Sequence, residues 1–213
     1  ATADSDGVSI DGGTVTITAP GTYRLSGSLS DGQVVVDSAA EGAVQIILAG
    51  VDITSSATSA LAIMDADEAV VILADGTSNK LADATTYIYP DADTNEPNAA
   101  LFSAADLTIA GSGSLAVIGN ANDGIASKDG LVITAATVEV SAVDDGLRGK
   151  DYVSVQDATI TVKTGGDGIK SDNDEDADLM TVSGVNTAEY QAKLKTLREA
   201  VEDRLRRARV RSI

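Results

Sequence analysis

A short phrase that combines aspartate with glycine occurs three times in the second half of the chain, at a spacing of 22 residues. The three copies are Asn122-Asp123-Gly124-Ile125, Asp144-Asp145-Gly146-Leu147 and Gly166-Asp167-Gly168-Ile169. Carboxylate oxygens are the ligands that hard divalent cations, above all Ca²⁺, prefer in proteins. The chain contains neither His nor Cys, the usual ligands of softer metals. The sequence therefore predicts a calcium site with the ligands Asp123, Asp144, Asp145, Asp151, Asp167 and Asp172.

Turn chemistry offers a simpler interpretation of the same phrase. Asp-Gly is common in turns because Gly adopts positive φ and Asp caps the local backbone. This accounts for a single Asp-Gly pair. It does not account for the doubled Asp144-Asp145 with Asp151 following. Both interpretations remain open from the sequence.

Four of the seven basic residues between positions 1 and 185 follow the aspartate of the phrase by three to five positions. They are Lys128, Arg148, Lys150 and Lys170. Cations beside calcium-loaded carboxylates can hold the carboxylates of a uronic acid polymer, so we predict that these four bind carbohydrate. The alternative is a local ion pair between each base and a neighbouring Asp, worth less than about 1 kcal/mol if exposed.

A repeating backbone must position these side chains, because the register persists between the phrases. Ile133 recurs as Val155, and Val138 recurs as Ile160. Apolar and polar residues alternate strictly over 137–141 and 159–163, which is the period of a strand and not of a helix. A fixed period filled with short β-branched runs predicts an all-β solenoid with coils of about 22 residues.

Stacking of such coils brings equivalent residues to within roughly 4.8 Å of one another. The expected first column contains Asp123, Asp145 and Asp167, with Asp144 beside it. The expected second column contains Asp129, Asp151 and Asn173. Carboxylates about 5 Å apart repel one another by about 1–3 kcal/mol per pair, so a cation is expected among them.

Strand and turn signals continue through residues 1–185, which we assign to one solenoid domain. Residues 82–97 interrupt the pattern with two prolines and three aspartates and predict a protruding loop. Its Tyr87 and Tyr89 could stack on sugar rings or pack against their own domain. The run from Ala69 to Leu73 is apolar on both alternating faces, which predicts a strand covered on two sides.

The composition changes abruptly at residue 186. Asn186 and Glu189 resemble a capping box, and Tyr190, Leu194 and later apolar residues recur at a spacing of three or four. An amphipathic α-helix is therefore predicted within 186–213. It could cap the open end of the solenoid or mediate self-association. An altered reading frame would also explain the abrupt change.

Acidic residues dominate the chain, whose formal net charge is −18. This balance argues against nucleic acid and anionic membranes as partners and suits divalent cations and, through them, an acidic polymer. No apolar run reaches the length of a membrane-spanning helix. The start at Ala1 without Met, together with abundant Thr, Ser, Asp and Gly, predicts a secreted or cell-surface protein with its signal peptide removed.

Five further motifs occur in order along the chain. They are Thr22-Tyr23-Arg24-Leu25-Ser26-Gly27-Ser28-Leu29, Gly50-Val51-Asp52-Ile53-Thr54-Ser55, Asp75-Gly76-Thr77-Ser78-Asn79-Lys80-Leu81, Asn122-Asp123-Gly124-Ile125-Ala126-Ser127-Lys128-Asp129 and Asp145-Gly146-Leu147-Arg148-Gly149-Lys150-Asp151. This combination resembles a bacterial family known as carbohydrate-binding-domain-containing proteins, over residues 8 to about 176. The resemblance implies a right-handed parallel β-helix similar to polysaccharide lyases, with calcium along the coils and display outside the cell. It also implies binding of an acidic plant polysaccharide such as polygalacturonate, the acidic polymer of pectin. The family pattern would continue with further coils beyond Asp176, where this chain departs into the predicted helix.

Three functions are consistent with these residues. The first is non-catalytic, calcium-dependent binding of an acidic polysaccharide. The second is a lyase that cleaves the same polymer by β-elimination, with Lys150 or Arg148 as the base. The recurrence of Lys128 and Lys150 in successive coils favours repeated binding over a single catalytic centre. The third is a structural or adhesive surface solenoid in which calcium only stabilises the coils.

Overall fold

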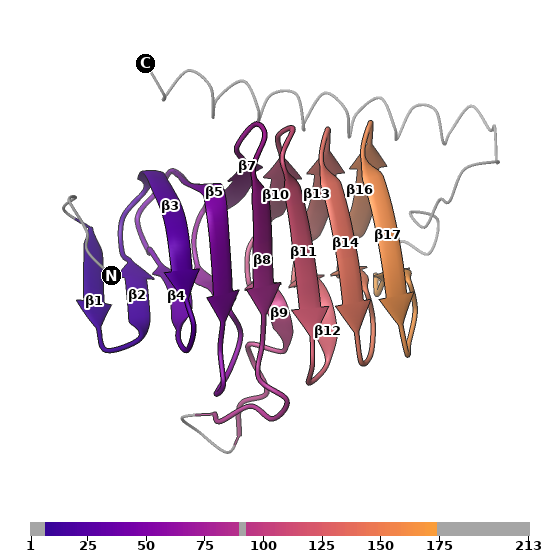
Figure 1. The fold of residues 1–213 in the computed structure, drawn as a ribbon, viewed down its shortest axis with the longest axis horizontal. Coiled ribbons are helices and arrows are strands. Elements are labelled where there is room, and N and C mark those ends of the chain that lie inside the picture. Colours follow the sequence, from indigo (N-terminus) through magenta and orange to yellow (C-terminus); the bar gives the residue numbers. More distant parts are fainter. Residues whose placement is uncertain (1–6, 90–92, 174–213) are drawn as a thin grey trace.

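Short strands follow one another along the whole described part of the chain (Figure 1). The computed structural model describes residues 7–89 and 93–173. Its strands are β1 (Val8–Asp11), β2 (Thr14–Ile17), β3 (Gly21–Leu29), β4 (Gln33–Asp37), β5 (Ala43–Thr54), β6 (Leu61–Asp65), β7 (Glu68–Leu73), β8 (Ser78–Ala82), β9 (Ala99–Ser103), β10 (Leu107–Ala110), β11 (Ser114–Gly119), β12 (Asp123–Ser127), β13 (Gly130–Thr134), β14 (Thr137–Ala142), β15 (Leu147–Gly149), β16 (Tyr152–Gln156), β17 (Thr159–Thr164) and β18 (Ile169–Ser171). The helix predicted within 186–213 lies outside the described residues, so its role as a cap or in self-association stays a prediction. Among the described residues, no helix has the length and apolar character needed to cross a membrane.

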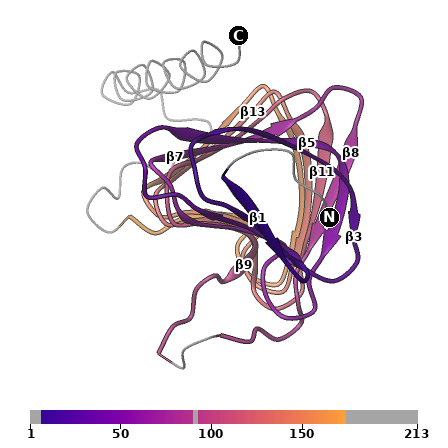
Figure 2. The same ribbon diagram turned by 90° about the vertical axis from the view of Figure 1, so that its left-hand side faces the viewer.

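Parallel strands stack into a solenoid of about six turns, which confirms the predicted all-β architecture. One face contains β2, β4, β6, β9, β12, β15 and β18 in this order, and β1 pairs with β2 in antiparallel fashion at the N-terminal end. The other two faces contain the series β7, β10, β13, β16 and the series β8, β11, β14, β17. Figure 2 looks along the stack and shows the coils closing around a common interior.

The two series are joined by the long strand β5. Its first half pairs with β7, and its second half pairs with β8. The change of direction falls at Gly50, which has a φ of 80°, a conformation that glycine adopts without the steric cost of a side chain. The buried Asn79 fixes this corner by accepting the backbone N–H groups of Gly50 and Val51 at 2.9 and 3.1 Å.

The register of the last coils follows the predicted period. Ile133 pairs with Val155, Val138 with Ile160, and Leu147 with Ile169. Earlier coils are longer, since Leu101 pairs with Leu61 on one side and with Ile125 on the other. The coil of 22 residues is therefore a property of the C-terminal turns.

The interior is built from stacked apolar side chains. Val34, Leu61, Leu101, Ile125 and Leu147 occupy equivalent positions in successive coils and are all buried. Burial of each such side chain contributes about 1.5–3 kcal/mol. On β7 the neighbouring Val70 and Val71, which face opposite ways, are both buried, as the continuous apolar run predicts.

One long segment leaves the regular path between β8 and β9. The described residues between 83 and 98 form no strand and project away from the coils (Figures 1 and 2). Backbone N–H groups of Ala84 and Ile88 donate to the carbonyls of Thr58 and Ala57 at 3.1 and 2.8 Å. The base of the segment is thereby held against the turn that precedes β6.

Candidate functional site

The repeated aspartates lie in stacked turns at one corner of the solenoid, where the chain passes from β11 to β12, from β14 to β15 and from β17 to β18. The backbone N–H of Asp145 donates to Oδ1 of Asp123 at 3.2 Å, and the N–H of Asp167 donates to Oδ1 of Asp145 at 2.8 Å. The three residues form a column, as the period of 22 residues predicts. Each carboxylate accepts a hydrogen bond from the following coil, so the column also links the coils.

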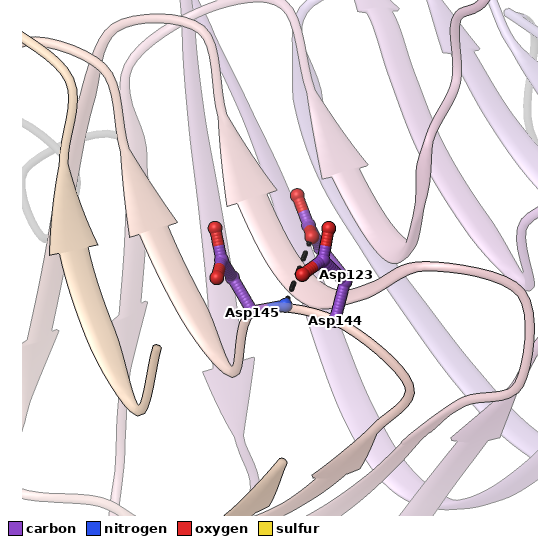
Figure 3. Close-up of side chains that lie close together, drawn as sticks. All are labelled: Asp123, Asp144 and Asp145. Atoms are coloured by element: carbon purple, nitrogen blue, oxygen red, sulfur yellow. Dashed lines mark hydrogen bonds between the residues drawn. The ribbon is translucent and has the colours of Figure 1, made fainter. Parts of the chain in front are cut away.

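Three carboxylates of this corner come close together (Figure 3). Asp123, Asp144 and Asp145 each offer one ligand oxygen, and these oxygens lie within 4.8 Å of one another. Asp123 and Asp145 are buried, whereas Asp144 is exposed and leaves the group open to solvent. A donor set made only of oxygens fits a hard cation such as Ca²⁺. The group could therefore hold a metal ion.

Two of the predicted bases complete the same corner. Nη1 of Arg148 lies 3.3 Å from Oδ2 of Asp123, and Nζ of Lys170 lies 3.1 Å from Oδ2 of Asp145. Arg148 and Lys170 are paired in register on β15 and β18, so each base reaches back to the acid of the preceding coil. Asp172 joins them, since its carboxylate pairs with Nε of Arg148 and lies 3.6 Å from Nζ of Lys170. The local ion pairs considered as an alternative are present for these two bases.

Burial and charge act in opposite directions at Asp123. Desolvation raises the pKa of this carboxyl above its ordinary value, although the N–H of Asp145 and the guanidinium of Arg148 act to lower it. The hydrogen bond and charge of Asp145, followed by the charge of Asp172, raise the pKa of Lys170. Burial acts to lower the pKa of Arg148, but hydrogen bonds and charges from Asp172 and Asp123 outweigh it and raise that pKa. Both bases are thus held in their protonated forms.

The glycines of the phrase have a different role from the one turn chemistry assigns. Gly124, Gly146 and Gly168 are not among the glycines with positive φ. A Cβ at Gly124 would lie 2.2 Å from Cγ1 of Val140, and a Cβ at Gly146 would lie 2.5 Å from Cγ1 of Val162. Glycine is therefore required by close packing at the inner side of the corner. The aspartates likewise bond to the next coil instead of capping their own turn.

The remaining predicted residues lie further from this group. Asp151 follows β15, at the opposite end of that strand from Asp145, and its N–H donates to the carbonyl of Asp129 at 3.2 Å. Asn173 donates to the carbonyl of Asp151 at 3.5 Å, so the expected second column is formed at another corner. Lys128 forms an ion pair with Glu96 in the projecting segment. Lys150 is exposed, and no ion pair to it is present among residues 7–89 and 93–173.

Asn122 belongs to this corner although the sequence did not single it out. Its Nδ2 donates to the carbonyl of Asn98 at 3.0 Å, and its own carbonyl accepts the N–H of Asp144 at 3.1 Å. It therefore connects the projecting segment to the acidic turns. The available signal was its place in the phrase, which Asp144 and Gly166 occupy in the next two coils.

Comparison with known proteins places this corner in a wider context. A family described as carbohydrate-binding domain-containing protein matches residues 11–201. A protein of that description from Acetivibrio thermocellus is 40% identical over 137 residues, which cover 64% of this chain and 48% of the relative. The chain thus spans about half the length of that relative. A solved structure titled as the polysaccharide lyase-like protein from C. thermocellum, in a gadolinium derivative, has 38% sequence identity and a TM-score of 0.80, covering 83% of this chain and 71% of the other.

Proposed function

The chain belongs to the family of carbohydrate-binding domain-containing proteins, and from this premise we propose that it binds an acidic polysaccharide such as polygalacturonate without cleaving it. Binding takes place outside the cell or at its surface, along the corner formed by the turns before β12, β15 and β18. The observation that carries the proposal is the column in which each buried aspartate is paired with a base of the following coil. Such a column repeats the same polar contacts along one direction, as a polymer ligand requires.

Calcium is the proposed metal of this site. Asp123, Asp144 and Asp145 would hold it, and its remaining coordination positions can be shared with the carboxylates of a uronate chain. The solved relative was studied with gadolinium, which, like calcium, is a hard cation that takes oxygen ligands. This supports a hard-cation site in the fold. The exposed Lys150 would contact a further carboxylate of the polymer.

The lyase alternative depends on a basic group that can lose its proton. Arg148 and Lys170 are poor candidates, because their acidic partners keep them protonated. Lys150 is exposed and is therefore the base that a lyase would use. Incubation with polygalacturonate and calcium, followed by absorbance of unsaturated uronate products, decides this question. Accumulation of product that is lost in Lys150→Ala would replace the binding proposal by the lyase.

Affinity electrophoresis through gels that contain polygalacturonate tests the binding proposal. We expect retardation with calcium and none with a chelator. Asp145→Asn removes one carboxylate of the group and should abolish most of the retardation. Asp37→Asn is the matched control, since Asp37 is an exposed acid at the end of β4 in a distant coil. Equal retardation of the wild type with and without calcium, or of both variants, would refute the proposal.

A further inference from the structure

A cleft of about 410 Å³ lies between the projecting segment and the turn that precedes β12. The residues used below, all of which line it, are Thr86, Tyr87, Tyr89, Asn95, Asn98 and Asn122. The volume falls within the range of about 300–1,000 Å³ that is typical of sites for small ligands. This cleft is separate from the group of three carboxylates described above.

The lining combines aromatic rings with amides and hydroxyls and is uncharged. None of the described residues that line the cleft is acidic or basic, although the chain as a whole carries a net charge of −18. A carboxylate ligand would therefore find no cation among these side chains. An uncharged sugar ring would find aromatic faces for its C–H groups, and amides of Asn95 and Asn98 for its hydroxyls. The chemistry of the cleft selects a neutral pyranose over a uronate.

The two aromatic rings are fixed by their own hydroxyl groups. Tyr87 donates to Oδ2 of the buried Asp83 at 2.6 Å, and Tyr89 donates to the carbonyl of Pro97 at 3.2 Å. Their ring centroids lie 5.9 Å apart with an interplanar angle of 51°, so the rings form a corner and do not stack face to face. Rings held in place before binding lose little side-chain entropy when a ligand arrives. The hydroxyls are engaged by the protein, while the rings line the cleft.

One polar atom of the lining lacks a partner. Oδ1 of Asn98 is buried, and it has no hydrogen bond to any described residue. A buried acceptor without a partner is costly, and a ligand hydroxyl that donates to it removes that cost. The orphan oxygen is therefore an independent indication of a ligand with hydroxyl groups.

The cleft adjoins the acidic column through a shared turn. Asn122 donates to the carbonyl of Asn98 on one side and accepts the N–H of Asp144 on the other. We propose that the cleft binds an uncharged sugar unit, such as a methyl-esterified uronate, of the polysaccharide whose acidic units lie along the column. This inference rests on the proposed function and adds a second, metal-independent subsite to it. The protein would then recognise a partly neutralised polymer instead of a uniformly charged one.

Calorimetric titration with two galacturonan oligomers of the same length, one fully methyl-esterified and one free of ester, tests the inference on the full chain. The esterified oligomer should bind in the presence of a chelator. Tyr89→Ala should weaken this binding about tenfold, because it removes a stacking face. Tyr89→Phe keeps the ring and should stay within about threefold of the wild type. Asn98→Ala should weaken binding about three- to tenfold without touching either ring, and it decides the matter if Tyr89→Ala fails to fold.

Ile88→Ala is the matched control, since Ile88 lies between the two tyrosines, is 73% exposed and does not line the cleft. It should bind the esterified oligomer as the wild type does. Failure of the wild type to bind that oligomer, or an equal loss in Ile88→Ala and Tyr89→Ala, would overturn the inference. Binding of the esterified oligomer alone would refute the acidic site and leave the cleft in place. Binding of the free acid alone would do the reverse.

Discussion

Substitution of a single glycine should reveal how tightly the acidic corner is packed. A Cβ at Gly146 would lie 2.5 Å from Cγ1 of Val162 and 2.6 Å from the carbonyl oxygen of Gly168. The second contact is with backbone, which cannot rotate away. Overpacking of this kind costs about 1–3 kcal/mol, so Gly146→Ala should lower the free energy of unfolding by an amount in that range. For a domain of this size the loss corresponds to a fall in Tm of about 2–12 °C.

Gly168 provides the matched control at the equivalent position of the next coil. The nearest atom to a Cβ built there is Cγ1 of Val162, at 4.0 Å, which is ordinary van der Waals contact. Both substitutions restrict the unfolded chain alike, by about 0.4–1 kcal/mol, so this contribution cancels in the comparison. The difference between the two variants then measures the clash alone.

Thermal unfolding followed by circular dichroism measures both variants, without divalent ions and with calcium. Gly146→Ala should melt below the wild type, and Gly168→Ala should melt at or slightly above it. The calcium response should also shrink in Gly146→Ala, because its clash displaces the adjacent Asp145. Equal melting temperatures in the two variants would refute the view that the glycine of the phrase is required by close packing.

Three further substitutions address the polar contacts. Asp145→Ala should cost about 1 kcal/mol more than Asp145→Asn in urea unfolding, because Asn retains an oxygen that can accept the N–H of Asp167. Burial raises the pKa of Asp123, so the native state holds its proton to higher pH than the unfolded state does. The stability that this proton confers is present below the unfolded value of about 3.9 and is lost as pH rises through the folded value, so Asp123→Asn should gain on the wild type over that interval in metal-free urea titrations. Tyr87→Phe removes the donor to the buried Asp83 and should cost about 1 kcal/mol locally, seen as faster proteolysis between residues 83 and 98 with little change in Tm.

Much of the architecture could be predicted from the pattern of side chains. The strict alternation around Val138 and Ile160 identifies strands, and their separation sets the register in which they pair. Stacking of Asp123, Asp145 and Asp167 then follows from geometry, because equivalent positions of successive coils are hydrogen-bonded neighbours. The period sufficed here because every coil after Ile125 has the same length.

Other features depend on contacts that no local pattern contains. The need for glycine at position 146 arises from Val162, which is a neighbour only after the chain has completed most of a coil. The pairing of Arg148 with Asp123 likewise joins residues of different coils, whereas the sequence draws attention to the aspartates beside Arg148. The cleft required the described part of segment 83–98 to fold back against Asn122, and irregular segments carry no period from which this could be predicted.

The backward reach of each base makes the phase of the chain as important as its composition. A deletion of one whole coil of 22 residues would bring the next acid and the next base into the same relation, and a shorter site would result. A deletion of 21 residues would turn every later side chain to the opposite face of its strand. The fold can thus be lengthened or shortened only in whole coils, and the number of sugar units it grips would change in the same steps.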